Sequence, residues 1–294
     1  MKVLVIGSSG QVARSLAERA ETRTGIELRV IGRPDVDLEL PGSAASVIAA
    51  AAPDVVINAA AYTAVDLAED EPDRAFRINA DAAGEIAAAT AGKARLIHIS
   101  TDYVFDGRAH GAYREDAEPN PLNVYGRSKL AGEANVRSAN PEHLIVRTSW
   151  VYSPFGRNFV TTMMAAADGK GRLTVVDDQR GCPTSALDLA EGILCVADAW
   201  SSGGHTGLGQ TYHLAGTGST SWCGFAQAIM DGRQAHGLKT AAVAPIQTKD
   251  WPTRAERPRN SRLDSGKFLR DFGFAMPEWR SSLAEVVGRL AKRV

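Results

Sequence analysis

Tyr125 and Lys129 are the residues of this sequence whose types and spacing best suit acid–base chemistry. They are one helical turn apart, so on a helix their side chains share one face. A phenol loses its proton near pH ~10, and a neighbouring ammonium favours the phenolate. Thr101 follows the apolar run Leu96–Ile99, and a hydroxyl at the carboxyl end of a parallel strand faces the ligand-binding crevice. We therefore expect Tyr125 to protonate a substrate oxygen to which Thr101 also donates.

A glycine-bearing turn, Gly7-Ser8-Ser9-Gly10, directly follows the apolar run Val3–Ile6 and leads into a helical stretch. Glycines let backbone N–H groups approach a pyrophosphate, and a helix N-terminus adds partial positive charge. The spacing is G-x-x-G-x-x-A, with Ala13 small enough for close packing of helix on strand. The turn predicts a dinucleotide site that includes Gly7, Gly10, Gln11 and Val12.

The segment after the expected second strand indicates which nicotinamide cofactor binds. An acid there favours a free ribose 2′-hydroxyl, and an arginine favours a 2′-phosphate. Arg33 comes first in this segment, so we expect NADPH, with NADH as the alternative. Asp37 and Leu38 then flank the adenine. The competing interpretation of Arg33 is an ordinary solvated surface residue.

Compact apolar runs alternate with longer helical stretches in the first half of the chain. The expected strands are Val3–Ile6, Leu28–Ile31, Val55–Ile57, Leu96–Ile99 and Leu144–Val146. The expected helices are Ala13–Ala20, Ser43–Ala52, Ala75–Ala91 and Arg127–Ser138. Unbroken apolar runs are typical of strands buried on both faces, and the alternation implies parallel pairing through right-handed crossovers. We predict an α/β fold with a doubly wound parallel (Rossmann) sheet.

The composition changes after Trp150, where prolines and glycines become frequent. We expect residues 1–150 to form the dinucleotide-binding domain and residues 151–294 to form a smaller α/β domain, mainly for substrate. A strand over Tyr212–Leu214 is expected to return to the first sheet, and an amphipathic helix to span about Glu278–Lys292.

Composition excludes several classes of protein. The 294 residues are 44% hydrophobic and carry a net charge of −1, which gives no global field for nucleic acid or anionic lipid. No apolar run approaches the ~20 residues of a membrane span. The three cysteines form no C-x-x-C pair, which disfavours disulfides and zinc and fits a reducing compartment. We expect a cytoplasmic protein without a metal site, either a monomer or a homodimer.

The phosphate turn, the strand-end threonine and the Y-x-x-x-K pair together resemble the extended short-chain dehydrogenase/reductase superfamily. Longer strings over most of the chain resemble the dTDP-4-dehydrorhamnose reductase family. They are Asn58–Asp66 (NAAAYTAVD), Ser100–Phe105 (STDYVF), Pro121–Gly126 (PLNVYG), Arg147–Tyr152 (RTSWVY), Asp178–Thr184 (DQRGCPT) and Arg257–Leu263 (RPRNSRL).

The resemblance implies NAD(P)H-dependent reduction of the 4-keto group of dTDP-6-deoxy-L-lyxo-4-hexulose to dTDP-L-rhamnose, a precursor of cell-wall polysaccharide. It implies that Lys129 lowers the tyrosine pKa and holds the nicotinamide ribose, and that Tyr125 also contacts the cofactor. Small residues after the third strand would line the cofactor: Ala59, Ala60 and Ala61. The sugar would be surrounded by Thr63, Val65, Tyr103 and Trp150. The nucleotide diphosphate would be reached by Asn158, Gln179, Arg257 and Asn260.

Other interpretations compete with this one. Tyr103 and Trp150 suit a core as well as a sugar site, and the six basic residues between Trp251 and Arg270 suit a solvated face as well as a diphosphate. A sugar-nucleotide dehydratase would show Thr-Asp-Glu where this chain has Tyr103 after Asp102. Another sugar-nucleotide reductase or epimerase remains an alternative, as does a non-catalytic regulatory subunit resembling that of methionine adenosyltransferase.

Overall fold

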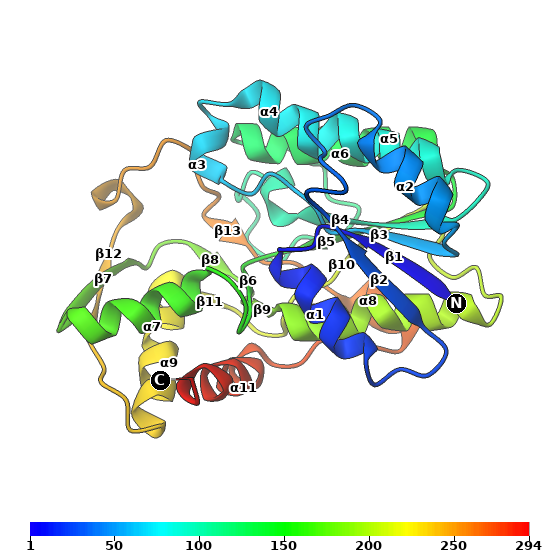
Figure 1. The fold of residues 1–294 in the computed structure, drawn as a ribbon. Helices are drawn as coiled ribbons and strands as arrows, with labels where there is room; N and C mark the ends of the chain where they lie inside the picture. The colour runs from blue at the N-terminus through cyan, green and yellow to red at the C-terminus, as the bar shows by residue number, and fades with distance from the viewer. Residues whose placement is uncertain (294) are drawn as a thin grey trace.

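The centre of the fold is a six-stranded parallel sheet in the order β10-β5-β4-β3-β1-β2 (Figure 1). The computed structural model describes residues 1–293. The strands are β1 Lys2–Ile6, β2 Glu27–Ile31, β3 Val55–Asn58, β4 Arg95–Thr101, β5 His143–Thr148 and β10 Gln210–His213. The apolar runs of β1 and β3 are buried, as expected for strands covered on both faces. The prediction of a doubly wound parallel sheet is confirmed.

Helices cover both faces of this sheet (Figure 1). One face carries α2 Ser43–Ala51, α4 Pro72–Phe76, α5 Ala82–Thr90 and α6 Val124–Ala139. The other carries α1 Gln11–Ala20 and α8 Ala186–Ser201. A short helix, α3 Val65–Ala68, follows β3. Helix α8 lies beyond residue 150, and so does β10, which pairs with β5 at the residues where a returning strand was expected.

The single helix expected over Ala75–Ala91 is wrong in one respect. A π-helical turn, Arg77–Asp81, separates α4 from α5. Asn79 lies in this turn, and its side chain bonds both backbone groups of Tyr62 and the hydroxyl of Ser128. A π-bulge is a common device at functional sites, and this one aims a buried amide at the loop after β3.

The later part of the chain forms a second core beside the sheet, on the left of Figure 1. Its helices are α7 Phe159–Gly169, α9 Trp222–Ala235 and α11 Trp279–Ala291. Helix α10 Gly266–Phe272 packs instead against β10, where Phe268 joins the core of the main sheet. The strands of the second core are β6 Val151–Tyr152, β7 Arg172–Val176, β8 Arg180–Gly181, β9 Thr184–Ser185, β11 Thr220–Ser221, β12 Ala242–Ile246 and β13 Asn260–Ser261. They pair as three small sheets, β12-β7, β6-β9 and β11-β8-β13. This core packs on α8 and on the loop after β5.

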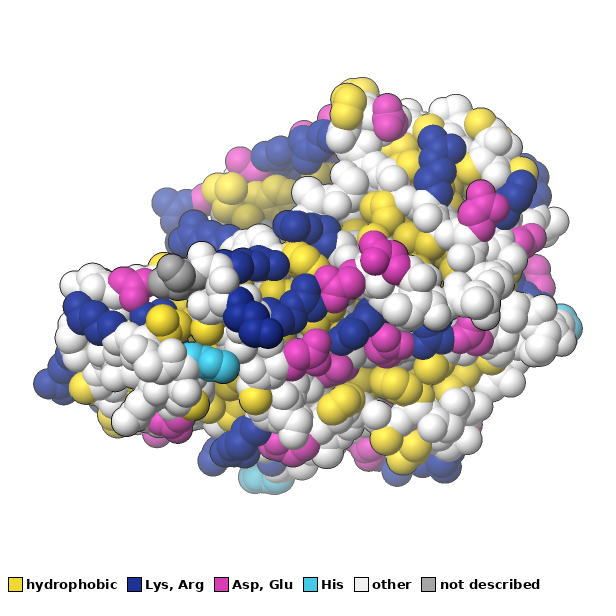
Figure 2. All heavy atoms as spheres, turned by 60° about the horizontal axis from the view of Figure 1, so that its bottom comes forward, with side chains coloured by type: hydrophobic (Ala, Val, Ile, Leu, Met, Phe, Trp, Pro, Cys, Tyr) yellow, Lys and Arg dark blue, Asp and Glu magenta, His cyan; other side chains and the backbone are white. Residues whose placement is uncertain are grey.

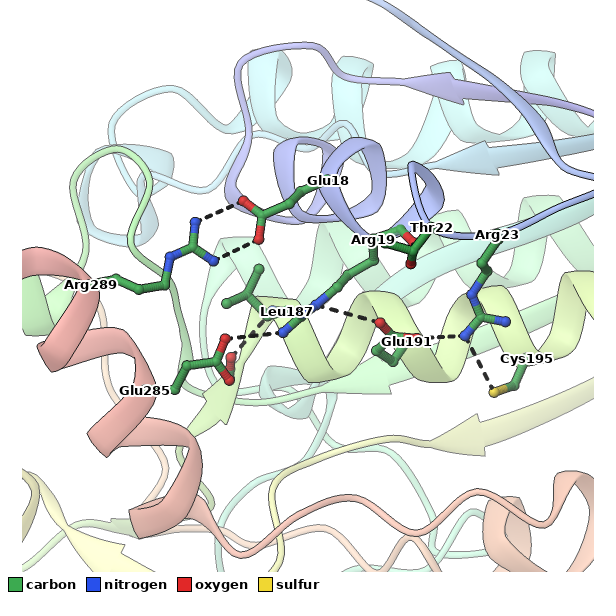
Figure 3. A network of polar contacts seen from close by, with 10 residues as sticks. Glu18, Arg19, Thr22, Arg23, Leu187, Glu191, Cys195, Glu285 and Arg289 are labelled. Carbon is green, nitrogen blue, oxygen red and sulfur yellow. Dashed lines mark hydrogen bonds and ion pairs between the residues drawn. The ribbon is translucent and has the colours of Figure 1, made fainter.

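Ion pairs join the first helix of the chain, α1, both to α8 and to the last helix, α11 (Figure 3). Arg289 of α11 binds both carboxylate oxygens of Glu18 on α1, at 2.6 and 2.7 Å. Arg19 reaches Glu191 of α8 at 3.5 Å and Glu285 of α11 at 3.2 Å. Figure 2 brings this side of the molecule forward and shows basic and acidic side chains interspersed. The contacts tie the helix that follows the glycine turn to the end of the chain.

No helix within residues 1–293 is both long enough and apolar enough to cross a membrane.

Candidate active site

Thr101 is the last residue of β4 and lies at the carboxyl end of the sheet. Its side chain is buried, with 5% exposed. The Thr101 hydroxyl donates to Oδ1 of Asp102 at 3.0 Å and accepts from the backbone N–H of Tyr103 at 3.2 Å. These two bonds fix the rotamer of the hydroxyl that was expected to orient a substrate oxygen.

The start of α6 is shaped to press Tyr125 against the end of β4. Asn123 caps the helix by accepting from the N–H of Gly126 at 2.8 Å, and Glu69 accepts from the N–H of Val124 at 2.7 Å. A Cβ on Gly126 would lie 2.2 Å from the carbonyl oxygen of Tyr103, so only glycine allows this approach. As a result the rings of Tyr103 and Tyr125 meet edge to face, with centroids 5.5 Å apart.

Burial raises the pKa of Tyr125 to about 12. Hydrogen bonding with Thr101 opposes the rise, and the nearby Asp102 carboxylate adds to it. Below that pH the phenol keeps its proton, which is the form that a general acid needs. Tyr125 and Thr101 therefore come together as expected, with the proton held on the tyrosine.

Lys129 is almost fully buried, with 2% exposed, and its Nζ donates to the carbonyl oxygen of Ile99 at 2.7 Å. Burial lowers its pKa to about 8, and the charge of Glu133 opposes that fall. The expected lowering of the Tyr125 pKa by Lys129 is not found: burial dominates, and Lys129 is not among the groups that shift that pKa. The structure thus places the amine below the tyrosine, bonded to β4.

Asp102 is a buried carboxylic acid beside the same hydroxyl, with 2% exposed. Burial raises its pKa to about 7, while hydrogen bonds from Ser261 and Thr101 oppose the rise. A dehydratase would need an acid–base pair at this strand end, but the following residue is Tyr103, whose own pKa burial raises.

The glycine turn fits a dinucleotide pyrophosphate. Gly7 has φ +116°, and a Cβ there would lie 2.9 Å from the backbone nitrogen of Ala60. Gly10 is the N-cap of α1 without a side-chain cap, and a Cβ on it would contact no protein atom within 4 Å. The fold therefore requires glycine at position 7, whereas at position 10 it leaves open space beside the uncapped N–H groups of α1. Such a helix end suits a phosphate.

The other expected cofactor residues lie around this turn. Gln11 is held by the late part of the chain, since its Oε1 accepts from Ser153 at 2.9 Å. Arg33 is exposed and lies 3.6 Å from Glu39. Asp37 accepts from the N–H of Glu39 at 3.0 Å. The remaining members line the carboxyl edge of β1 and β3 or the loop after β2: Val12, Leu38, Ala59, Ala60 and Ala61.

Of the residues expected around the sugar, Tyr103 contacts Tyr125, and the others lie on other segments. Thr63 and Val65 follow β3, and Tyr103 follows β4. Trp150 has a positive φ of +47° and stacks on Trp222, with centroids 3.5 Å apart. A strained backbone of this kind is frequent at ligand sites, which favours the binding interpretation of Trp150 over that of a plain core residue.

The residues expected at the diphosphate divide into two groups. Arg257 is half-buried and ion-paired with Asp66. The others already use their amides inside the protein. Asn158 caps α7 and donates to Ser153, Asn260 donates to Ala109 and Gly111, and Gln179 donates to Thr248. Asn158 and Asn260 thus shape the loops in this structure, whereas the charge of Arg257 acts on Tyr103 and opposes the rise of its pKa.

Sequence reasoning missed several residues that build the site. Asn79 and Trp222 had no motif of their own. Glu133 had a signal, because it continues the spacing of Tyr125 and Lys129 by one more helical turn. Asp66 stood inside a quoted string, but its partner Arg257 is distant in the sequence and only the fold brings them together.

Comparison with known proteins identifies the family of this chain. The family model described as RmlD substrate binding domain matches residues 1–292. A dTDP-4-dehydrorhamnose reductase of Sinorhizobium fredii is 44% identical over 291 residues, covering 99% of this chain and 98% of that protein. A crystal structure of a dTDP-4-dehydrorhamnose reductase from Clostridium acetobutylicum superposes with a TM-score of 0.90 at 36% identity, covering 99% of both chains.

A second solved structure carries a cofactor. It is the dTDP-4-dehydrorhamnose reductase of Bacillus anthracis in complex with NADP, with a TM-score of 0.88 and 36% identity, covering 97% of this chain and 98% of that one. The order of the motifs and the fold therefore agree with sequence similarity over nearly the whole length. The chain belongs to the RmlD substrate binding domain family, the family of the dTDP-4-dehydrorhamnose reductases.

Proposed function

We propose that this protein reduces the 4-keto group of dTDP-6-deoxy-L-lyxo-4-hexulose with NADPH to give dTDP-L-rhamnose. The observation that carries the proposal is the meeting of Thr101, Tyr125 and Lys129 at the carboxyl end of β4, in a chain 44% identical to a dTDP-4-dehydrorhamnose reductase. The NADP-bound relative from Bacillus anthracis supports the choice of cofactor.

The chemistry divides between cofactor and protein. Bound NADPH supplies a hydride to the carbonyl carbon. Tyr125 gives its proton to the carbonyl oxygen, so the ketone becomes an alcohol and the nicotinamide is oxidised. The Thr101 hydroxyl turns its proton from Asp102 to the same oxygen when substrate binds, and so orients it. Lys129, buried beneath the tyrosine, holds the nicotinamide ribose in this proposal.

The two parts of the chain share the ligands in this proposal. Residues 1–150 hold the dinucleotide on the Gly7–Gly10 turn, and residues 151–294 mainly hold the sugar nucleotide, with Trp150 and Tyr103 beside the sugar and Arg257 near the diphosphate. The three free cysteines suit the cytoplasm. We propose a monomer or a homodimer with neither nucleic acid nor membrane as a partner.

Each competing function differs from the proposed one in a residue of this chain or in its use of NADPH. A dehydratase needs a base after Asp102, where this chain has Tyr103. A regulatory subunit has no use for a buried lysine whose pKa is lowered to about 8. An epimerase that reoxidises its product would keep its nicotinamide and would consume no NADPH.

A substrate panel tests the proposal. Purified protein is mixed with NADPH and the dTDP 4-keto sugar, with the corresponding UDP 4-keto sugar as the matched comparison. We expect one NADPH to be oxidised for each dTDP sugar reduced. The loss of reduced-nicotinamide absorbance measures the NADPH consumed, and identification of the product measures the sugar reduced. Absence of NADPH consumption with every 4-keto sugar would favour the regulatory function, and an altered sugar without NADPH consumption would favour an epimerase.

A further inference from the structure

Glu133 is a fully buried carboxylate on α6, one helical turn beyond Lys129, with 0% exposed. Its Oε1 accepts from the hydroxyl of Ser100 at 2.6 Å and from Nε of Arg147 at 2.8 Å. Its Oε2 accepts from Nη2 of Arg147 at 2.7 Å and from Nη2 of Arg137 at 2.8 Å. Both carboxylate oxygens are therefore fully engaged, and the pKa of Glu133 is lowered although burial alone would raise it.

The neighbours of Glu133 connect it to the reacting groups. Ser100 lies between Ile99, whose carbonyl accepts from Lys129, and Thr101. The carboxylate thus fixes the last residues of β4 from below while Lys129 and Tyr125 project from the preceding turns of the same helix. Taking an ammonium out of water is costly unless an anion stays near it, and Glu133 is the group whose charge favours the ammonium form of Lys129.

We propose that Glu133 is a positioning residue of the reductase: it keeps Lys129 charged inside the protein and holds the Ser100–Thr101 strand end in register with Tyr125. The proposal deepens the function proposed above and rests on it for the role of Lys129. We expect Arg147 to oppose this effect, because its buried guanidinium pairs with Glu133 at 2.7 Å.

No other group on the described elements around Lys129 has a charge that raises the Lys129 pKa. From β4, His98 is buried, and burial together with the Lys129 charge lowers its pKa well below the usual range, so the ring is neutral. Strand β5 contributes Arg147 and His143, and burial lowers the pKa of His143. From α6 itself come Tyr125 and Arg137. The strand-end turn contributes Asp102, the π-helical turn contributes the uncharged Asn79, and α3 is followed by Glu69, which is bonded to Val124.

Paired variants with opposite expected effects test the proposal. Glu133→Gln removes the anion and keeps the shape, whereas Arg147→Met removes the cation that offsets it. The measurement is a pH titration of the ε-¹³C resonance of Lys129, assigned by its loss in Lys129→Arg. We expect the Lys129 midpoint to fall by about 1 to 3 pH units in Glu133→Gln and to rise in Arg147→Met. If Glu133 had a purely structural role, both variants would lose stability, and the Lys129 midpoint would not move in opposite directions in the two.

A double variant keeps the test decisive if Glu133→Gln does not fold. Glu133→Gln/Arg147→Met replaces a buried ion pair with a neutral pair, a change that proteins often tolerate. Its Lys129 midpoint is expected below that of Arg147→Met alone, and equal midpoints would overturn the proposal. The alkaline limb of kcat, measured on the dTDP 4-keto sugar, is expected to move with the resonance. Shifted resonances without turnover, in the wild-type protein as well, would refute the proposed function and leave the role of Glu133 standing.

Discussion

Arg257 holds Asp66 through two parallel hydrogen bonds, from Nη1 to Oδ1 at 3.1 Å and from Nη2 to Oδ2 at 2.7 Å. The pair joins α3, just after β3, to the late segment that runs from β12 towards β13 (Figure 1). Asp66 also accepts from the N–H of Ala255 at 3.1 Å, and Arg254 pairs with Asp70. The late arginines therefore lie against α3 and the turn that follows it.

The first prediction concerns this pair. Arg257→Lys keeps the positive charge but loses the planar fork that two-point binding needs. We expect the KM for the dTDP sugar to rise about tenfold, equivalent to ~1.4 kcal/mol, with the Kd for NADPH unchanged. Steady-state kinetics and cofactor titration measure both. Arg254→Lys, the same exchange at an exposed pair, is the control and should change little. An unchanged KM in Arg257→Lys would remove Arg257 from substrate binding.

The second prediction concerns the proton donor. Tyr125→Phe removes the hydroxyl whose pKa burial raises to about 12. We expect kcat to fall by roughly 10² to 10⁴ while the Kd for NADPH stays within a factor of about two. Tyr113→Phe is the matched control, because Tyr113 stacks on Phe105 and bonds Asp106 away from Thr101. Equal turnover in the two variants would show that another group protonates the substrate.

The third prediction follows from the buried lysine. Its pKa falls from 10.5 to about 8 on folding, so between these values the unfolded chain binds more protons than the folded one, and stability rises with pH. Below pH 8 the folded protein carries the full cost, at most about 3 kcal/mol. Lys129→Met should therefore be inactive yet more stable near neutral pH, by less than that amount because the bond to Ile99 is lost.

Chemical denaturation over a range of pH measures the free energy of unfolding of both proteins. The difference in the free energy of unfolding between Lys129→Met and the wild-type protein should be greatest below pH 8 and should shrink towards pH 10.5. A variant less stable than the wild-type protein at every pH would contradict the assignment of an ammonium cost to this site.

The fourth prediction separates two glycines of one turn. Gly10→Ala should lose less than ~1 kcal/mol of stability, because a Cβ there contacts no protein atom, yet its Kd for NADPH should rise at least about tenfold. Gly7→Ala should lose stability as well, by about 1–3 kcal/mol, because φ is +116° and the backbone of Ala60 is 2.9 Å away. Thermal unfolding and cofactor titration distinguish them. Normal NADPH binding by Gly10→Ala would place the pyrophosphate elsewhere.

The fifth prediction concerns cofactor choice. Arg33 is exposed and its nearest acid is Glu39 at 3.6 Å, so its guanidinium is accessible to a ribose 2′-phosphate. Arg33→Ala should weaken NADPH by about tenfold, near the value of one charge-assisted contact, and leave NADH nearly unchanged. Equal losses for the two cofactors would make Arg33 a surface residue without a role in selection.

The sequence alone predicted the parts of the fold that local pattern controls. Buried strands such as Val3–Ile6 are unbroken apolar runs, and the helix that carries Tyr125 and Lys129 follows from spacing. The π-helical turn at Asn79 was missed because its cause lies outside the segment, in bonds to Tyr62 and Ser128. A local pattern carries no information about such partners.

The site shows the same division. Thr101 and Tyr125 were predicted to act on one substrate oxygen because a hydroxyl at the carboxyl end of a parallel strand faces the ligand-binding crevice. The expectation that Lys129 lowers the tyrosine pKa failed because spacing reports a shared helix face but not burial, and burial dominates here. Likewise, the amides of Asn158 and Asn260 were assigned to a diphosphate, whereas the structure engages them in loop hydrogen bonds.

The return of β10 and α8 to the sheet has a consequence for biosynthesis. A nascent chain that ends near residue 150 leaves β5 as an unpaired edge and exposes the apolar face on which α8 packs, including Leu144 and Val146. Such an edge invites pairing with another chain. The nucleotide half should therefore aggregate when expressed alone, and during translation the two halves should reach their native state together, only after β10 has left the ribosome.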